Sequence, residues 1–163
     1  KANLGQVMRS RNDGAAAVSL FTEALEIAER KGLNRMKLDI LRNLVELGAA
    51  EPDGALAEME AIADRLADMP VRMGLLELRG NLAAAAGSAA EAEKNYDAGL
   101  ELYAGGRIDD DLAAAGLFSS RAKLHLKDGR EDMAAQDTER ARELYLKWGR
   151  LREAKAVESL AGD

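Results

Sequence analysis

The only histidine of the chain, His125, is the side chain whose ordinary pKa best suits it to act as a general base near neutral pH. Two hydroxyl groups that could serve as nucleophiles, those of Ser119 and Ser120, stand just before it in the sequence. They share its predicted helix, so they are helical neighbours and do not come from the separate elements that build a catalytic triad. Because His125 lies between Leu124 and Leu126, a packed or half-exposed helical residue is the favoured interpretation.

Metal and phosphate chemistry find equally little support in the sequence. The chain has no cysteine, which excludes thiol nucleophiles, disulfides and cysteine zinc sites. The acidic run 109–111 lacks the alternating oxygen ligands and the closing glutamate of an EF-hand, so we expect it to cap the following helix. The segment 105–107 lacks a phosphate-binding loop pattern and is typical of a helix stop. We therefore expect no enzyme activity, no cofactor and no bound metal.

Two further features have a structural and a functional interpretation. Paired carboxylates, such as Glu58 with Glu60 and Asp64 with Asp68, are interpreted as solvated helix faces. Trp148, the only tryptophan, stands near a predicted helix end. We expect it to pack against the last helices, and a docking hot spot is the alternative.

Composition excludes several functional classes. Acidic residues outnumber basic ones by 29 to 23, so the net charge is −6, and a general nucleic-acid or anionic-membrane binder is not expected. The most apolar stretch, 81–90, is too short and too alanine-rich to span a bilayer. We expect a cytoplasmic protein without nucleic-acid or membrane partners. The chain does not begin with Met, which suggests a fragment of a longer or processed chain.

The elements that must position these residues are helices. Apolar residues recur at spacings of three and four along nearly the whole chain, and no stretch alternates with period two. Turn residues such as Gly32, Pro52, Gly87 and Gly129 separate the apolar stripes. The pattern predicts an all-α protein of eight helices, followed by a short helix over 150–160.

These stripes repeat. Four segments align without gaps on the reference residues Gly5, Asn43, Gly80 and Ala122. Twelve residues further on, every segment has alanine: Ala17, Ala55, Ala92 and Ala134. Sixteen residues on come Phe21, Met59, Tyr96 and Thr138, and nineteen on come Ala24, Ile62, Gly99 and Ala141. Arginine precedes three of the reference residues, at 42, 79 and 121. We favour structural ion pairs across the stack for these arginines over contacts with a ligand.

This pattern resembles the tetratricopeptide repeat, a helix–turn–helix unit with small residues where its helices cross and a large residue at the next hairpin. Segments one and three match best, through Leu4-Gly5 with Ala17 and Phe21, and through Gly80 with Ala92 and Tyr96. The resemblance implies a right-handed α-α superhelix in one domain, 1–163. Its four hairpins would span roughly 1–31, 34–68, 70–105 and 109–148, and a capping helix 150–160.

In that family the first helix of each hairpin lines a concave groove that binds a peptide or helix of a protein partner. The groove positions implied here are Gln6, Arg9, Leu44, Leu47, Glu77, Asn81, Ser119, Lys123 and Lys127. Cationic residues at the groove ends suit an acidic ligand, although a solvated face is the alternative for the two lysines. The family's carboxylate clamp is not expected, because Glu77 and Gly116 stand where it requires lysine.

Two alternatives concern the chain's surroundings. The ending 143–156 is similar to the close of helical-repeat regions in large bacterial ATPase-linked transcription regulators. That likeness implies a sensory or regulatory arm that acts by intramolecular contact or self-association. The first hairpin also looks truncated before Gly5, so an apolar edge of Leu4, Val7 and Met8 is predicted to pack on a missing segment or on a second copy of the chain.

Overall fold

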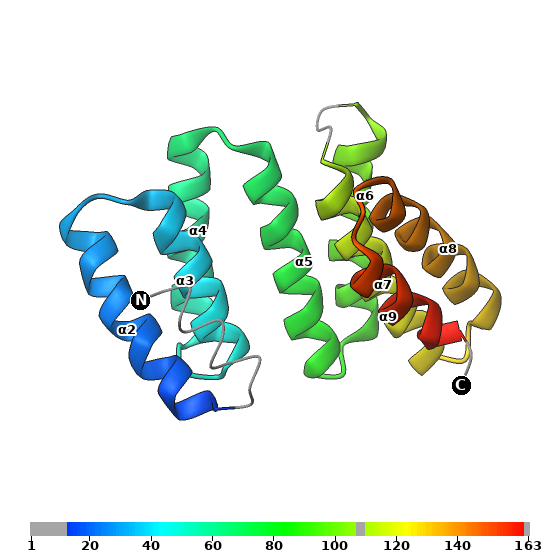
Figure 1. Ribbon diagram of the computed structural model, residues 1–163, viewed down its shortest axis with the longest axis horizontal. Helices are drawn as coiled ribbons and strands as arrows, with labels where there is room; N and C mark the ends of the chain where they lie inside the picture. The colour runs from blue at the N-terminus through cyan, green and yellow to red at the C-terminus, as the bar shows by residue number, and fades with distance from the viewer. Residues whose placement is uncertain (1–12, 107–109, 162–163) are drawn as a thin grey trace. The chain divides into compact units, whose positions relative to one another are not determined.

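The computed structural model describes residues 13–106 and 110–161, and this part of the chain consists of helices joined by turns, without a strand (Figure 1). The predicted all-α class is therefore confirmed. The chain divides after Ala67 into two compact units, each of which is described by itself. The organisation into one superhelical domain stays a prediction. The first helix expected from the sequence, together with Gln6, Arg9 and the predicted apolar edge, lies outside the described residues.

The first unit contains three helices: α2 (Gly14–Arg30), α3 (Asn34–Glu46) and α4 (Pro52–Leu66). Asp13 caps α2 as predicted, because its carboxylate accepts a hydrogen bond from the backbone N–H of Ala16. Glu51 caps α4 in the same way, and Pro52 occupies the first helical position, where its missing N–H costs nothing. Local sequence thus determines where these helices begin.

The core of the first unit is apolar. Phe21 of α2 packs against Ile40 and Leu44 of α3, and the alanines of α2 let the two helices approach closely. Helix α4 packs on α3 and buries Met59 and Ile62. Since these side chains are spaced three and four residues apart, each helix buries one face.

The second unit contains five helices and a terminal 3₁₀ turn. Their bounds are α5 (Met69–Ala85), α6 (Ala89–Ala104), α7 (Asp111–Lys127), α8 (Glu131–Lys147), α9 (Leu151–Glu158) and η1 (Ser159–Ala161). Helix α5 packs on α6 and α7, α7 packs on α6 and α8, and α9 packs on α8. The turn after α5 requires Gly87, whose φ is +80°, and the N–H of Ser88 there donates to the carbonyl of Ala83 at 2.8 Å.

The core of this unit depends on glycines as well as on large residues. Tyr96 of α6 is buried against Gly80 of α5, where the ring leaves no room for a β-carbon. A β-carbon at Gly99 would lie 2.7 Å from Cδ1 of Leu117 on α7. Both glycines belong to aligned repeat columns, and both permit a close helix crossing.

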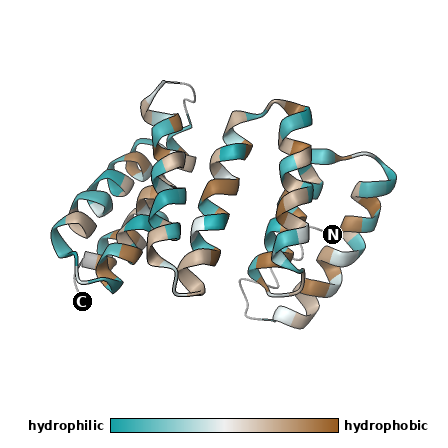
Figure 2. Cartoon of the chain, turned by 180° about the vertical axis from the view of Figure 1, so that it is seen from behind, coloured by the Kyte–Doolittle hydropathy of each residue, from teal (hydrophilic) through white to brown (hydrophobic). Residues whose placement is uncertain are grey.

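The aligned columns coincide with buried positions in both units. All four column alanines are buried, and so are the four residues sixteen positions after the reference residues, Thr138 included. Between these positions hydrophilic residues alternate with hydrophobic ones along the helices (Figure 2). The repeat alignment therefore identifies core positions, whereas membership of the tetratricopeptide family stays a prediction. None of the described helices has the length and apolar character needed to cross a membrane.

Candidate functional site

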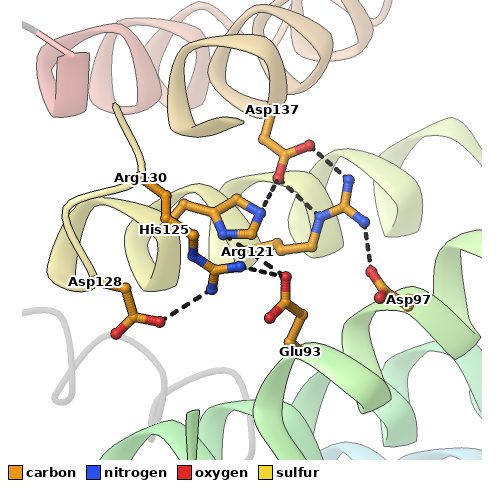
Figure 3. Close-up of polar contacts among 7 residues, drawn as sticks. All are labelled: Glu93, Asp97, Arg121, His125, Asp128, Arg130 and Asp137. Atoms are coloured by element: carbon orange, nitrogen blue, oxygen red, sulfur yellow. Dashed lines mark hydrogen bonds and ion pairs between the residues drawn. The ribbon is translucent and has the colours of Figure 1, made fainter. Parts of the chain in front are cut away.

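Seven charged or titratable residues gather where α6, α7 and α8 meet, and Figure 3 shows them pointing toward one another. We call this group the polar cluster: Glu93, Asp97, Arg121, His125, Asp128, Arg130 and Asp137. Helix α6 supplies two of its carboxylates, α7 supplies Arg121 and His125, and the remaining three come from the α7–α8 turn and α8.

Arg121 lies at the centre of the polar cluster. Its Nε and Nη2 donate to both carboxylate oxygens of Asp137, at 2.8 and 2.7 Å, and its Nη1 donates to Asp97 at 2.5 Å. The guanidinium carbon also lies 5.7 Å from the centroid of the Phe118 ring. The hydrogen bonds that Arg121 donates to Asp137 raise the pKa of Arg121 above its ordinary value. One arginine thereby joins α7 to both α6 and α8.

The three arginines of the repeat column do not behave alike. Arg121 forms the interhelical pairs that the structural interpretation predicts. Arg42 pairs with Glu46 of its own helix at 3.1 Å, and Arg79, although exposed, also has an interaction partner. A shared column position therefore does not by itself determine a shared partner.

His125 is buried in the same cluster, with 1% of its surface exposed. Its Nε2 lies 3.5 Å from Oδ2 of Asp137, and its Nδ1 lies 4.0 Å from Oε1 of Glu93. Nδ1 has no hydrogen-bond partner in the described part of the chain. Burial, aided by the positive charge of Arg130, lowers the pKa of His125. The expectation of a packed histidine is confirmed, and Ser120 directs its hydroxyl to Glu77 instead.

Arg130 completes the cluster at the start of α8. It donates to Glu93 of α6 at 2.6 Å and to Asp128 at 3.0 Å. The bond from Arg130 is the main cause that lowers the pKa of Glu93. The sequence did not predict this connection, because nothing in the sequence distinguishes Glu93 from the other acidic residues on the polar helix faces. The arginine placed directly after the Asp128-Gly129 turn was the available signal.

A second polar contact lies at the opposite end of α7. The carboxylate of Asp111 is buried and accepts hydrogen bonds from the Tyr103 hydroxyl at 2.6 Å and from Nε1 of Trp148 at 2.9 Å. Lys147 lies 2.6 Å away, and the bonds from Lys147, Tyr103 and Trp148 lower the pKa of Asp111 to about 2. Asp110 caps the helix as the acidic run predicts, whereas Asp111 connects the ends of α6 and α8.

Trp148 is only in part the packing residue expected from the sequence. Its indole N–H is held by Asp111, yet 58% of the residue is exposed. The carboxylates assigned to solvated faces also have partners: Glu58 pairs with Lys37 at 2.5 Å, and Asp68 accepts from the Val71 N–H at the start of α5. A solvated face was too simple an interpretation for these side chains.

The predicted groove residues of the second unit lie on α5 and α7, which pack against each other. Glu77 and Asn81 of α5 and Ser119 of α7 are half-buried, and Lys123 and Lys127 are exposed. Ser120 donates to Glu77 at 3.4 Å across the two helices. The Asn81 side chain accepts a hydrogen bond from the hydroxyl of the buried Tyr96 at 2.9 Å, and this bond to a core residue holds it in place.

Glu77 also limits what can stand opposite it. A β-carbon at Gly116 of α7 would lie 3.0 Å from Oε1 of Glu77, so the missing side chain gives this carboxylate its space. Negative charge on Glu77 contributes to the raised pKa values of Tyr96, which reaches about 12, and of Tyr145, although burial is the larger cause in both. The α5–α7 face thus presents one carboxylate at its centre and two lysines toward the end of α7.

The predicted groove residues of the first unit are placed differently. Leu44 is buried against Phe21 and Ala24, so the prediction that it faces a ligand is corrected to a core role. Leu47 is half-buried and packs against the same residues. Periodicity alone does not distinguish a groove face from the face that an adjacent helix covers, because both are apolar.

No cluster of three or more histidine or acidic side chains in the described ranges is placed to hold a metal ion. The sequence matches no model of a known protein family, and no curated protein is significantly similar to it.

Proposed function

We propose that this chain is a non-enzymatic protein-interaction module of the helical-repeat type, which binds an acidic peptide or helix along the α5–α7 face. The observation that supports this proposal most directly is the face itself. Neighbouring helices expose polar side chains from positions that the repeat alignment assigns to a ligand groove, including Asn81, Ser119 and Lys123.

Rigidity supports the same proposal. A binding face gains affinity when its side chains are held before the ligand arrives. Hydrogen bonds from Tyr96 and Ser120 hold Asn81 and Glu77 in place. Arg121 also joins α7 to α6 and α8 through its hydrogen bonds to Asp97 and Asp137. The face therefore needs little rearrangement on binding.

Charge determines the class of ligand. Lys123 and Lys127 stand one helical turn apart, and neither forms an ion pair within the described residues. Two unpaired cations on a chain of net charge −6 would speed the encounter with an acidic ligand and lose that effect in salt. A cytoplasmic location and the absence of nucleic-acid partners remain predictions from composition.

The test starts from peptides selected on the wild-type chain from a displayed random library. Association rates of a selected peptide are then compared for wild type and for the double variant Lys123→Glu with Lys127→Glu, at low and high salt. We expect slower association by about tenfold at low salt and convergence at high salt. The control is Lys94→Glu with Arg140→Glu, which changes net charge equally at exposed positions of α6 and α8, outside the α5–α7 face. Equal rates for the two double variants would reject the α5–α7 face.

A further inference from the structure

A second surface feature lies between the last two helices, away from the residues assigned to the α5–α7 face. A hollow of about 320 Å³ is lined by Leu146 of α8 and by Leu151 and Ala154 of α9. Ala154 is buried, whereas the two leucines remain open to solvent. The surfaces that line this hollow are mainly apolar.

Leu151 and Trp148 are the two most exposed large apolar residues in the described ranges, and both stand where α8 ends and α9 begins. Leu151 is 63% exposed and Leu146 is 41% exposed, and neighbouring Trp148 is 58% exposed. Scattered apolar residues are normal on a surface, but large ones gathered around a hollow are typical of an interaction site. Leu151 stands about one turn before Ala154 on α9, and it remains exposed whereas Ala154 and Val157 are buried.

The rim of the hollow is cationic. Arg142 of α8 and Arg152 and Lys155 of α9 contribute to the lining, against a single carboxylate, that of Glu158. Arg142 is already paired with Glu139 at 2.9 Å and lies 3.9 Å from Glu158. Across the described ranges, Arg152 and Lys155 form no ion pair. A local positive charge on an acidic chain selects ligands of the opposite sign.

We propose that the α8–α9 hollow is a second docking site, separate from the α5–α7 face, for an acidic segment of a partner protein that carries a large apolar anchor. The anchor, a leucine or phenylalanine, enters between Leu146 and Leu151. Its flanking carboxylates pair with Arg152 and Lys155. An amphipathic helix presents both groups on one side, since residues three and four apart share a face.

A second copy of the chain fits the hollow less well. In a two-fold symmetric contact the same patch meets itself, so the rim arginines and lysine of one copy would face those of the other. Like charges placed across an interface oppose association. The acidic partner segment avoids this repulsion.

The probes are a fluorescein-labelled amphipathic helical peptide, with leucine and phenylalanine on one face and glutamates flanking them on the same side, and a twin with lysine for every glutamate. Anisotropy measures binding of each to the wild-type chain, to Leu151→Asp and to Arg152→Glu with Lys155→Glu. Leu151→Asp changes an exposed residue, and circular dichroism verifies its fold. Met133→Asp is the matched control, since Met133 is another exposed apolar residue, at the far end of α8.

We expect the acidic peptide to bind wild type and the Met133→Asp control alike, and to bind Leu151→Asp and the charge-reversed double variant at least about tenfold more weakly. The lysine twin should not bind. Loss of binding in Lys123→Glu with Lys127→Glu, but not in Leu151→Asp, would assign the peptide to the α5–α7 face and overturn this proposal alone. Equal binding by all variants would overturn it as well. A dimer that sedimentation detects in wild type and not in Leu151→Asp would identify a second copy as the occupant instead.

Discussion

The two units of this chain bury different kinds of contact. In the first, α2 and α3 meet through Phe21, Ile40 and Leu44, and the ion pairs of Lys37 with Glu29 and Glu58 involve two half-exposed carboxylates. In the second, α6, α7 and α8 meet around charged groups, and both Asp137 and His125 are buried. The lesson is that one repeat pattern can be held together by packing in one place and by a polar network in another.

This difference has an energetic consequence. Truncating a buried apolar side chain lowers the stability of the protein in proportion to the volume removed. Removing one partner of a buried ion pair leaves the other charge buried without compensation, which is a larger cost. The second unit should therefore respond to single charge deletions and to pH, and the first unit should respond mainly to changes in side-chain volume.

The largest effect is expected on deleting the central cation. Arg121→Met leaves the Asp137 carboxylate buried without its bidentate partner, so the free energy of unfolding should fall by about 3–5 kcal/mol. The matched change in the first unit, Lys37→Met, should cost about 0–1 kcal/mol because the carboxylate partners remain hydrated. Urea denaturation followed by circular dichroism measures both.

A second variant checks the cause of that loss. Adding Asp137→Leu to Arg121→Met removes the stranded charge, so most of the lost stability should return. If the double variant is as unstable as Arg121→Met alone, packing around the side chain, and not the unpaired carboxylate, is responsible.

The alanine column should give the next largest effect, and an equal one in both units. Ala17→Leu and Ala92→Leu insert a branched side chain where helices cross at fully buried positions, so each should lower stability by about 1–3 kcal/mol. Ala15→Leu and Ala90→Leu make the same change at exposed positions of the same helices and serve as controls. Melting temperatures equal to wild type for the two buried variants would reject the repeat alignment.

Deleting the Asp111 carboxylate should cost no more stability than the alanine variants do, and its effect should depend on pH. Asp111→Asn weakens the bonds from Tyr103, Lys147 and Trp148, which we expect to cost about 1–3 kcal/mol. The folded-state pKa of Asp111 is lowered to about 2, so this stabilisation is complete above about pH 4 and disappears as pH falls toward 2.

Urea midpoints of wild type and Asp111→Asn at pH 4 and at lower pH, followed by the fluorescence of the single tryptophan, measure that dependence. The gap between the two proteins should narrow as the pH falls. A constant gap would mean that Asp111 acts through shape and not through its charge.

The smallest effect concerns His125. Burial lowers its pKa in the folded state, so the unfolded chain binds a proton that the folded chain does not, between pH 6.5 and the lowered value. The free energy of unfolding of the wild type should therefore fall by up to about 1.4 kcal/mol for each unit by which the pH decreases within that window. His125→Gln should remove this slope, because the chain has no other histidine. Parallel pH profiles for the two proteins would contradict the lowered pKa.

The positions of the helices and the buried positions of the repeat alignment could be predicted from the sequence. Asp13, Pro52 and Gly87 mark where helices start and stop because they act on the backbone next to them. The buried alanines were identified from their recurrence alone. Leu44 shows what periodicity cannot predict. An apolar stripe is compatible with burial in the core or with a groove, and Leu44 is buried because α2 packs against it.

The candidate sites depended more strongly on tertiary structure. Lys123 and Lys127 could be placed on one helix face from their spacing, but the Glu77–Ser120 contact needs α5 and α7 side by side. The α8–α9 hollow had only Trp148 as a sequence signal, and Trp148 itself proved to be tied to Asp111.

What the sequence determined by itself was the helical class, the helix boundaries and the positions that must be small or apolar, because these follow from local backbone preferences and from a periodic pattern. What only the tertiary structure decided was which charges meet. Arg121 could pair with any of several carboxylates, and its selection of Asp137 and Asp97 depends on three helices converging at one point. Electrostatic attraction has little specificity along the chain, so folded geometry determines the partner.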